Sequence, residues 1–247
     1  MPTPEIRIFK NLEELSQAAA AQLAEITSQT KPDGRPFSIA LSGGHTPKSL
    51  YELLATQQFS SRIPWSRVHL FQVDERCVPP TSAESNYRMI REAMLDKIAL
   101  PSGHFHRMAA EEPDRDAASQ SYAAELQTIA ADSSEKWPRL DLIFLGLGED
   151  GHTASLFPSS PALQEENLAV CPNWVEKLGM WRLTLTYPVL NAAARIIFLV
   201  AGPEKAEIAR QILRSSPAAA LYPAQRVRPS NGTVAWFLDE AAARSLA

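Results

Sequence analysis

The sequence predicts an α/β fold, a doubly wound, mostly parallel sheet flanked by helices. Short apolar runs rich in β-branched residues alternate with longer segments whose apolar residues recur at helical spacing. With 247 residues, 45% of them apolar, the chain can bury a substantial core, and disorder is excluded. We expect one domain over residues 1–247, in which the chain can make a small excursion from the main fold around 160–182.

The strands are expected where the apolar runs are short and bounded by turn-forming residues. These runs cover 5–9, 36–41, 67–73, 140–146, 181–186, 195–201 and 233–238. Several are apolar almost throughout, which is typical of parallel strands that are buried on both faces.

The helices are expected between these strands, at 11–28, 47–56, 86–98, 114–131 and 203–213. The first has the clearest start, because Asn11 is followed three residues later by Glu14, as in a capping box. Residues 131–139 and 215–232 read as surface connections, because they are rich in Ser, Pro, Asp and Asn.

Charge and cysteine content limit the classes of function. The net charge of −4 and pI near 5.8 give no general attraction to nucleic acid or anionic membrane, so an anion would need a local site. Cys77 and Cys171 lack zinc-ligand spacing and indicate a reducing compartment. Because there is no leader-like start and no long apolar run, we expect a cytoplasmic protein without nucleic-acid or membrane partners.

Ligands of an open parallel sheet bind beyond the carboxyl ends of its strands, so the segments that follow the strands are the candidate site. Four of them are unusual: SGGHTP at 42–47, DERCVPPTSAESNY at 74–87, GEDGHTASLFP at 148–158 and GPEK at 202–205.

Two of these segments, 42–47 and 202–205, lie at a predicted helix start and carry residues that favour the binding of an anion there. Gly43 and Gly44 allow close backbone approach, while Thr46 as cap and Pro47 at the first helical position would leave free N–H groups. The segment matches neither the dinucleotide-binding nor the P-loop pattern, and a plain tight turn remains an alternative. Lys205 in a first helical turn opposes the helix dipole unless an anion lies nearby; the alternative is a solvated lysine.

The other two segments carry charged and titratable groups. Arg76 follows two acidic residues where the chain is expected to turn, either as surface charge or as a fork for phosphate or carboxylate. His152 lies in a glycine-rich loop two residues after Asp150, an arrangement that suits a general base.

The remaining histidines and motifs point to activated water rather than to other chemistry. We interpret His69, His104 and His106 as structural. No G-x-S-x-G elbow, H-E-x-x-H motif or convincing metal-ligand spacing is present, so a hydrolase here would use activated water without a metal.

Taken together, SGGHTP, VDERCVPPTSAESNY, GLGEDGHTASLFP and RLTLTYPVLNAAARIIFLVAGPEKA resemble the 6-phosphogluconolactonase family over essentially the whole chain. The resemblance implies hydrolysis of the phosphorylated sugar lactone 6-phospho-D-glucono-1,5-lactone in the oxidative pentose phosphate pathway, without metal or organic cofactor. We expect a monomer or weak homo-oligomer.

The resemblance also implies roles for individual residues. His152 would be the general base, with Asp74 and Asp150 shaping its setting. The phosphate would be held by Arg76, Lys205 and the backbone of Ser42, Gly43 and Gly44, with Arg182 facing the same pocket. His45 receives no role.

Three rival functions remain open. Glucosamine-6-phosphate deaminases resemble the same fold but carry a glutamate five residues after the histidine, where this chain has Phe157, and they lack an arginine at the position of Arg76. A sugar-phosphate sensor of a transcription regulator would need a DNA-binding module, for which we expect no room. A non-catalytic sugar-phosphate-binding protein is the third alternative.

Overall fold

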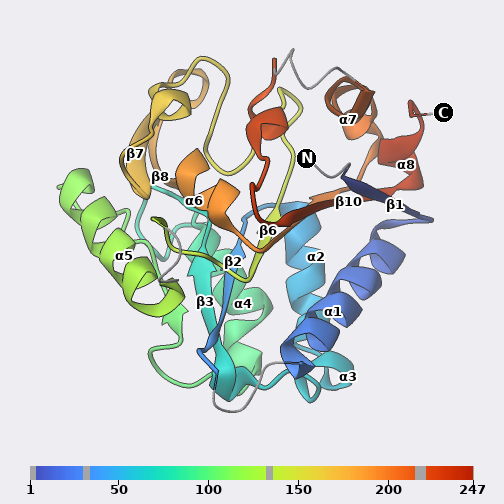
Figure 1. Cartoon of the computed structure of the whole chain (residues 1–247), viewed down its shortest axis with the longest axis horizontal. Coiled ribbons are helices and arrows are strands. Elements are labelled where there is room, and N and C mark those ends of the chain that lie inside the picture. Colours follow the sequence, from blue (N-terminus) through green and yellow to red (C-terminus); the bar gives the residue numbers. More distant parts are fainter. Residues whose placement is uncertain (1–3, 30–33, 132–135, 215–220, 247) are drawn as a thin grey trace.

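The computed structural model describes residues 4–29, 34–131, 136–214 and 221–246, and its centre is a seven-stranded sheet (Figure 1). The strand order is β1-β10-β9-β6-β2-β3-β5, and all neighbours are parallel. The strands are β1 Glu5–Phe9, β2 Phe37–Leu41, β3 Val68–Gln72, β5 Phe105–His106, β6 Leu142–Leu145, β9 Arg195–Val200 and β10 Thr233–Asp239. The predicted fold class is confirmed, and only β5 was missed in this sheet.

Helices cover both faces of the sheet. They are α1 Leu12–Ser28, α2 His45–Leu54, α3 Gln57–Ser60, α4 Asn86–Ala93, α5 Arg115–Ala130, α6 Tyr187–Ala192, α7 Ala206–Arg214 and α8 Glu240–Ala243. Alternate residues of β6 show the two-sided burial, because Leu142 and Phe144 pack with α1, α2 and α4, while Ile143 and Leu145 pack with α5 to α8. This arrangement is the doubly wound architecture that the apolar strands predict.

A second, antiparallel sheet corrects the sequence prediction at three places, one of which is the unpredicted strand Val170–Val175. It contains β4 Asp74–Arg76, β8 Met180–Leu185 and β7 Val170–Val175 in the order β4-β8-β7. The strand predicted at 181–186 exists but belongs to this sheet, and the charged residues 74–76 form a strand instead of a turn. Val73 joins the two sheets, because its N–H donates to Leu41 and its carbonyl accepts from Leu185, each at 2.9 Å.

The small excursion corresponds to this second sheet. Residues 160–182 contain the 3-10 turns Pro161–Gln164 and Glu176–Leu178, strand β7 and the first residues of β8. The β7–β8 hairpin turns at Gly179, whose φ of 58° lies in the left-handed region that glycine adopts without strain.

The start of α1 agrees with the sequence prediction, whereas the bounds of other helices differ from it. The Asn11 side chain caps α1 by accepting from Glu14 N at 2.9 Å, while Glu14 accepts from Lys10 N, one residue before the cap. The predicted helix 86–98 is α4 followed by a 3-10 turn at Leu95–Lys97, and α3, α6 and α8 lie outside the predicted helix ranges. Of the predicted surface connections, 132–135 and 215–220 lie outside the described residues.

Within the described part of the chain, no helix combines the length and the apolar character that a bilayer crossing requires.

Gly43 connects the start of α2 to α4 through a close contact. A Cβ at this position would lie 1.8 Å from Asn86 Oδ1, so the space that we expected a ligand to approach is filled by the Asn86 side chain. Asn86 in turn donates to the Asp74 carbonyl at 2.9 Å. Gly43 therefore allows β2, β4 and α4 to meet.

We predict that Gly43→Ala lowers the melting temperature, because the added methyl displaces Asn86 from Asp74. Overpacking of this kind costs about 1–3 kcal/mol, equivalent to roughly 3–10 °C in a chain of this size. The control is Gly146→Ala, since Gly146 has no positive φ and a Cβ there meets nothing within 4 Å. Equal thermal shifts by circular dichroism for both variants would contradict this packing account.

Candidate active site

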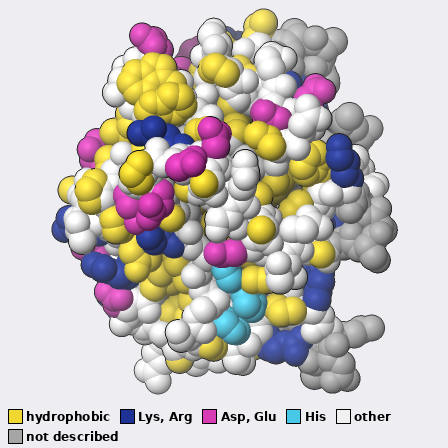
Figure 2. All heavy atoms as spheres, turned by 90° about the vertical axis from the view of Figure 1, so that its left-hand side faces the viewer, with side chains coloured by type: hydrophobic (Ala, Val, Ile, Leu, Met, Phe, Trp, Pro, Cys, Tyr) yellow, Lys and Arg dark blue, Asp and Glu magenta, His cyan; other side chains and the backbone are white. Residues whose placement is uncertain are grey.

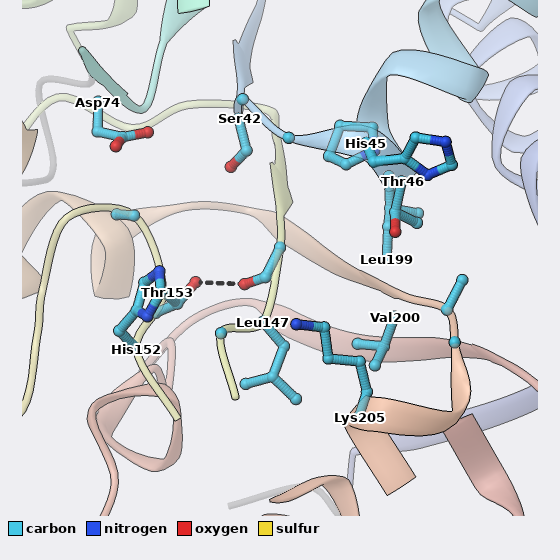
Figure 3. Close-up of a pocket in the computed structure, with 18 of the residues that line it drawn as sticks. Ser42, His45, Thr46, Asp74, Leu147, His152, Thr153, Leu199, Val200 and Lys205 are labelled. Carbon is cyan, nitrogen blue, oxygen red and sulfur yellow. Dashed lines mark hydrogen bonds between the residues drawn. The ribbon is translucent and has the colours of Figure 1, made fainter. Parts of the chain in front are cut away.

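A cavity of about 580 Å³ opens where β2, β6 and β9 end, beside strand β4 (Figure 3). It gathers eight of the nine predicted site residues in its lining: Ser42, Gly43, Gly44, Asp74, Arg76, His152, Arg182 and Lys205. Asp150, the ninth, does not line the cavity but contacts His152. The convergence follows from the parallel sheet, whose strand ends meet at one edge.

His152 and Asp150 form a close polar contact at the edge of the site. The His152 Nδ1 atom lies 2.5 Å from Asp150 Oδ1, which also accepts from the His152 backbone N–H at 3.2 Å. An ionised carboxylate only accepts, so the neutral imidazole carries its proton on Nδ1 and leaves the Nε2 lone pair available. The ring fits because a Cβ on Gly148 would lie 2.0 Å from His152 Nδ1.

Asp150 is held in its ionised form. Partial burial alone would raise the pKa of Asp150, but the hydrogen bond and charge of His152, its backbone N–H and the Lys177 ammonium together hold that pKa well below its ordinary value. Lys177 Nζ, on the turn before β8, lies 3.2 Å from Asp150 Oδ2. The carboxylate is thus ready to orient an imidazole and to stabilise its cation.

The start of α2 presents backbone N–H groups to the cavity, although not by the predicted cap. The helix begins at His45, so its N-cap is Gly44, with a φ of 105°, and Thr46 makes no capping hydrogen bond. Pro47 occupies the third helical position, where an N–H would be unpaired in any case. The N–H groups of Gly44, His45 and Thr46 donate no hydrogen bond within the described residues, which suits an anion.

Lys205 faces this helix start across the cavity. It ends the 3-10 turn Pro203–Lys205 before α7, and its amino group points into the cavity in Figure 3. Its side chain is mostly buried, and the nearest carboxylate partner among the described residues is the exposed Glu149, at 3.9 Å. This separation leaves the ammonium only weakly paired.

Asp74 and Arg182 meet through Ser155 on the β4 side of the cavity. Asp74 Oδ2 accepts from Ser155 Oγ at 2.6 Å and lies 3.7 Å from Arg182 Nη1, and all three residues are buried. Burial lowers the pKa of Arg182, Asp74 opposes that shift, and neighbouring Arg76 adds to it. Arg182 Nε has no hydrogen-bond partner among the described residues.

Arg76 is fixed by its neighbours in strand β4. It pairs in register with Arg182 on β8, and its Nη1 donates to the Glu84 carbonyl. Between these charges, Glu75 points into the protein and accepts from Gln72, Ser85 and the backbone N–H groups of 76, 86 and 87. Glu75 therefore anchors β4 to the start of α4.

Sequence reasoning missed the residues that support the predicted ones. Asn86 and Ser155 hold Asp74, and Asn173 holds Ser155 through a 2.8 Å bond from Nδ2 to the Ser155 carbonyl. The sequence offers no signal for these three residues, because their burial and their hydrogen-bond partners arise only in the folded chain.

The histidines outside the site form a separate cluster, and Figure 2 shows histidine side chains gathered at the surface. His69 stacks on His104, its Nδ1 lies 2.9 Å from His106 Nε2, and His106 contacts Glu125 at 3.0 Å. Burial and the two neighbouring histidines lower the pKa of His69 to about 4. None of the three lines the cavity, so they stay interpreted as structural.

Within the described ranges, no group of three or more His, Cys, Asp or Glu residues has a geometry suited to a metal ion.

Comparisons with known proteins show which family the chain resembles. Residues 10–236 match the family described as glucosamine-6-phosphate isomerases/6-phosphogluconolactonase. A 6-phosphogluconolactonase from Nostoc sp. is 38% identical over 91% of this chain and 90% of its own. One from Synechocystis sp. is also 38% identical, over 98% of each chain. The solved 6-phosphogluconolactonase of Trypanosoma brucei superposes with a TM-score of 0.86 at 30% identity, over 99% of both chains.

We predict that Asp150→Asn destabilises the protein more at pH 7 than at pH 3. The folded-state pKa of Asp150 lies below its unfolded value, so the stabilisation is complete above about pH 5 and is lost as the pH falls through the folded pKa. At pH 7 the melting temperature should drop by roughly 2–6 °C, and by less at pH 3. An equal drop at both pH values, measured by thermal unfolding, would argue against the ionised pair.

Proposed function

The chain belongs to the family of glucosamine-6-phosphate isomerases and 6-phosphogluconolactonases, and we propose that it hydrolyses 6-phospho-D-glucono-1,5-lactone to 6-phospho-D-gluconate. The observation that carries this proposal is the His152–Asp150 pair at the edge of a cavity that also receives Lys205, Arg76 and Arg182. The cavity thus combines a base with three cationic side chains, which suits a phosphorylated ester.

The proposed reaction uses His152 as general base. Its Nε2 takes a proton from water, the water oxygen bonds to the lactone carbonyl carbon, and the carbonyl oxygen gains negative charge. When the tetrahedral intermediate collapses, the bond from that carbon to the ring oxygen breaks. The imidazolium returns its proton to the departing alcohol oxygen, so the base is regenerated. Asp150 keeps the imidazole oriented and stabilises its charged form.

The proposed phosphate site lies at the start of α2. The N–H groups of Gly44, His45 and Thr46 supply hydrogen bonds, and Lys205 supplies a charge from the opposite wall (Figure 3). Arg76 and Arg182 add guanidinium donors from β4 and β8. The Ser42 hydroxyl donates to the Phe144 carbonyl at 2.8 Å and is therefore not free to bind phosphate. Ser42 contributes only by its place in the lining of the cavity.

Asp74 acts through its neighbours in this proposal. It balances the charge of Arg182 and accepts from Ser155 and Asn86, so it fixes the β4 side of the cavity. The site needs neither a metal nor an organic cofactor for this chemistry.

The deaminase-like alternative has less support. Moving protons between sugar carbons needs more acid–base groups than hydrolysis does, and position 157 carries a phenylalanine that stacks on His152. A non-catalytic sugar-phosphate-binding role would leave the His152–Asp150 pair without a purpose. As part of the same proposal we place the protein in the cytoplasm, acting in the pentose phosphate pathway, which suits the two free thiols Cys77 and Cys171.

We predict that His152→Ala lowers kcat by roughly 10² to 10⁴ with little change in KM, because the water loses its general base. The assay is hydrolysis of freshly generated lactone, corrected for the spontaneous reaction. His104→Ala, outside the cavity, is the control and should keep turnover per folded molecule. A chelator should change neither rate. A His152→Ala enzyme with more than about a third of wild-type turnover would overturn the assignment.

We predict that Arg76→Met and Lys205→Met each lower kcat/KM roughly tenfold to a hundredfold, the equivalent of one lost charge-assisted hydrogen bond of about 1.5–3 kcal/mol. The loss should be much smaller on glucono-1,5-lactone, which lacks the phosphate. Lys48→Met is the control, because Lys48 lies on α2 but pairs with Glu52 at the surface. If both lactones suffer equally, these residues do not recognise phosphate.

A further inference from the structure

Phe157 is the closest aromatic neighbour of His152 in the described structure. The two rings stack with centroids 3.9 Å apart and planes inclined by 20°. Phe157 is only 5% exposed, whereas the His152 side chain is 27% exposed. The phenylalanine is thus fixed by packing beneath an imidazole that reaches the cavity.

The loop between them is folded tightly enough to hold this stack. Thr153 and Leu156 form an isolated bridge, with Leu156 N donating to the Thr153 carbonyl at 2.9 Å. The Thr153 hydroxyl donates to the Gly146 carbonyl at 2.9 Å, which ties the loop to the end of β6. Ala154 adopts a φ of 51°, a strained value for a residue with a side chain.

The stack supplies a restraint that the Asp150 hydrogen bond lacks. A hydrogen bond at Nδ1 fixes one edge of the imidazole but leaves the ring free to tilt about the Nδ1···Oδ1 direction. A flat ring at van der Waals distance removes this freedom. The two contacts together fix both the edge and the plane of the imidazole, and therefore the direction of the Nε2 lone pair.

The stack also carries an electrostatic effect. The face of a phenyl ring is electron-rich and attracts a cation, so it favours the imidazolium that forms when His152 takes a proton. The Arg182 guanidinium carbon lies 5.5 Å from the Phe157 centroid, so the same ring contacts a second cationic group of the cavity. Phe157 thereby links the base to the arginine on β8.

We propose that Phe157 is a positioning residue for the hydrolysis, which fixes the plane of the His152 imidazole and stabilises its cation. The expected effects on kcat rest on the proposed function. The stacking itself can be tested without substrate.

The test compares Phe157→Leu with Phe71→Leu. Phe71 is fully buried on β3 and stacks on His106 with centroids 4.4 Å apart at 17°, so it is a matched phenylalanine–histidine stack outside the cavity. We expect Phe157→Leu to lower kcat roughly tenfold to a hundredfold with KM within about twofold, because a base displaced by about 1 Å loses its alignment. Phe71→Leu should lower the melting temperature but keep kcat.

Two further variants keep the test decisive if Phe157→Leu does not fold. Phe157→Met fills the space with a flexible side chain but has no ring, and it should show the same loss of kcat. Phe157→Tyr keeps the aromatic face and should retain kcat within about threefold. A folded Leu or Met variant with kcat within twofold of wild type, or a Tyr variant as impaired as Leu, would show that the stack does not position the base.

Proton NMR of the His152 ring provides a readout that needs no turnover. In wild type, the ring current of Phe157 should shift the carbon-bound protons of His152 upfield, and Phe157→Leu should abolish the shift while Phe71→Leu preserves it. If wild type hydrolyses no lactone but shows the shift, the proposed function fails and the contact stands. If wild type hydrolyses lactone without the shift, the inference about Phe157 is wrong.

Discussion

The hydrogen bond between His152 Nδ1 and Asp150 is the interaction on which the candidate site depends. It selects the imidazole tautomer, and with it the nitrogen that can accept a proton. The contact requires Gly148, whose missing Cβ leaves room for the ring, and an ionised Asp150, which Lys177 helps to maintain. The remaining architecture brings the start of α2 and the side chains of Lys205, Arg76 and Arg182 to the same cavity.

The second sheet adds two arginines to the lysine, Lys205, that follows β9 of the main sheet. After Val73 the chain leaves the parallel sheet, so that Arg76 on β4 lies beside Arg182 on β8. Two neighbouring arginines repel each other, and buried carboxylates offset this cost. Asp74 lies near Arg182, and Glu75 ties β4 to the start of α4. The protein itself therefore holds the arginines in place, as the proposed binding of phosphate requires.

The sequence predicted those parts of the molecule that depend on local pattern. Apolar runs identified six of the seven main strands, and the rule that ligands bind at strand ends selected the loops of Ser42, His152 and Lys205.

The sequence prediction failed where a segment pairs with a partner that lies far away along the chain. Strand β4 consists of three charged residues and carries no strand signal, and its partner β8 lies about a hundred residues away. Thr46 failed as a cap because Gly44, with its positive φ, starts α2 two residues earlier. Asn86 and Ser155 could not be assigned, because their partner is Asp74 on a strand that was not expected.

The proposed hydrolysis requires that Asp150 leave the Nε2 lone pair of His152 free for a water molecule. Nitrogen-15 NMR of the His152 ring, at a pH where the imidazole is neutral, measures this directly. We expect a proton on Nδ1 and an unprotonated Nε2 in wild type, and loss of this single tautomer in Asp150→Asn. A wild-type ring protonated on Nε2 would contradict the account, since that atom could not accept a proton from water.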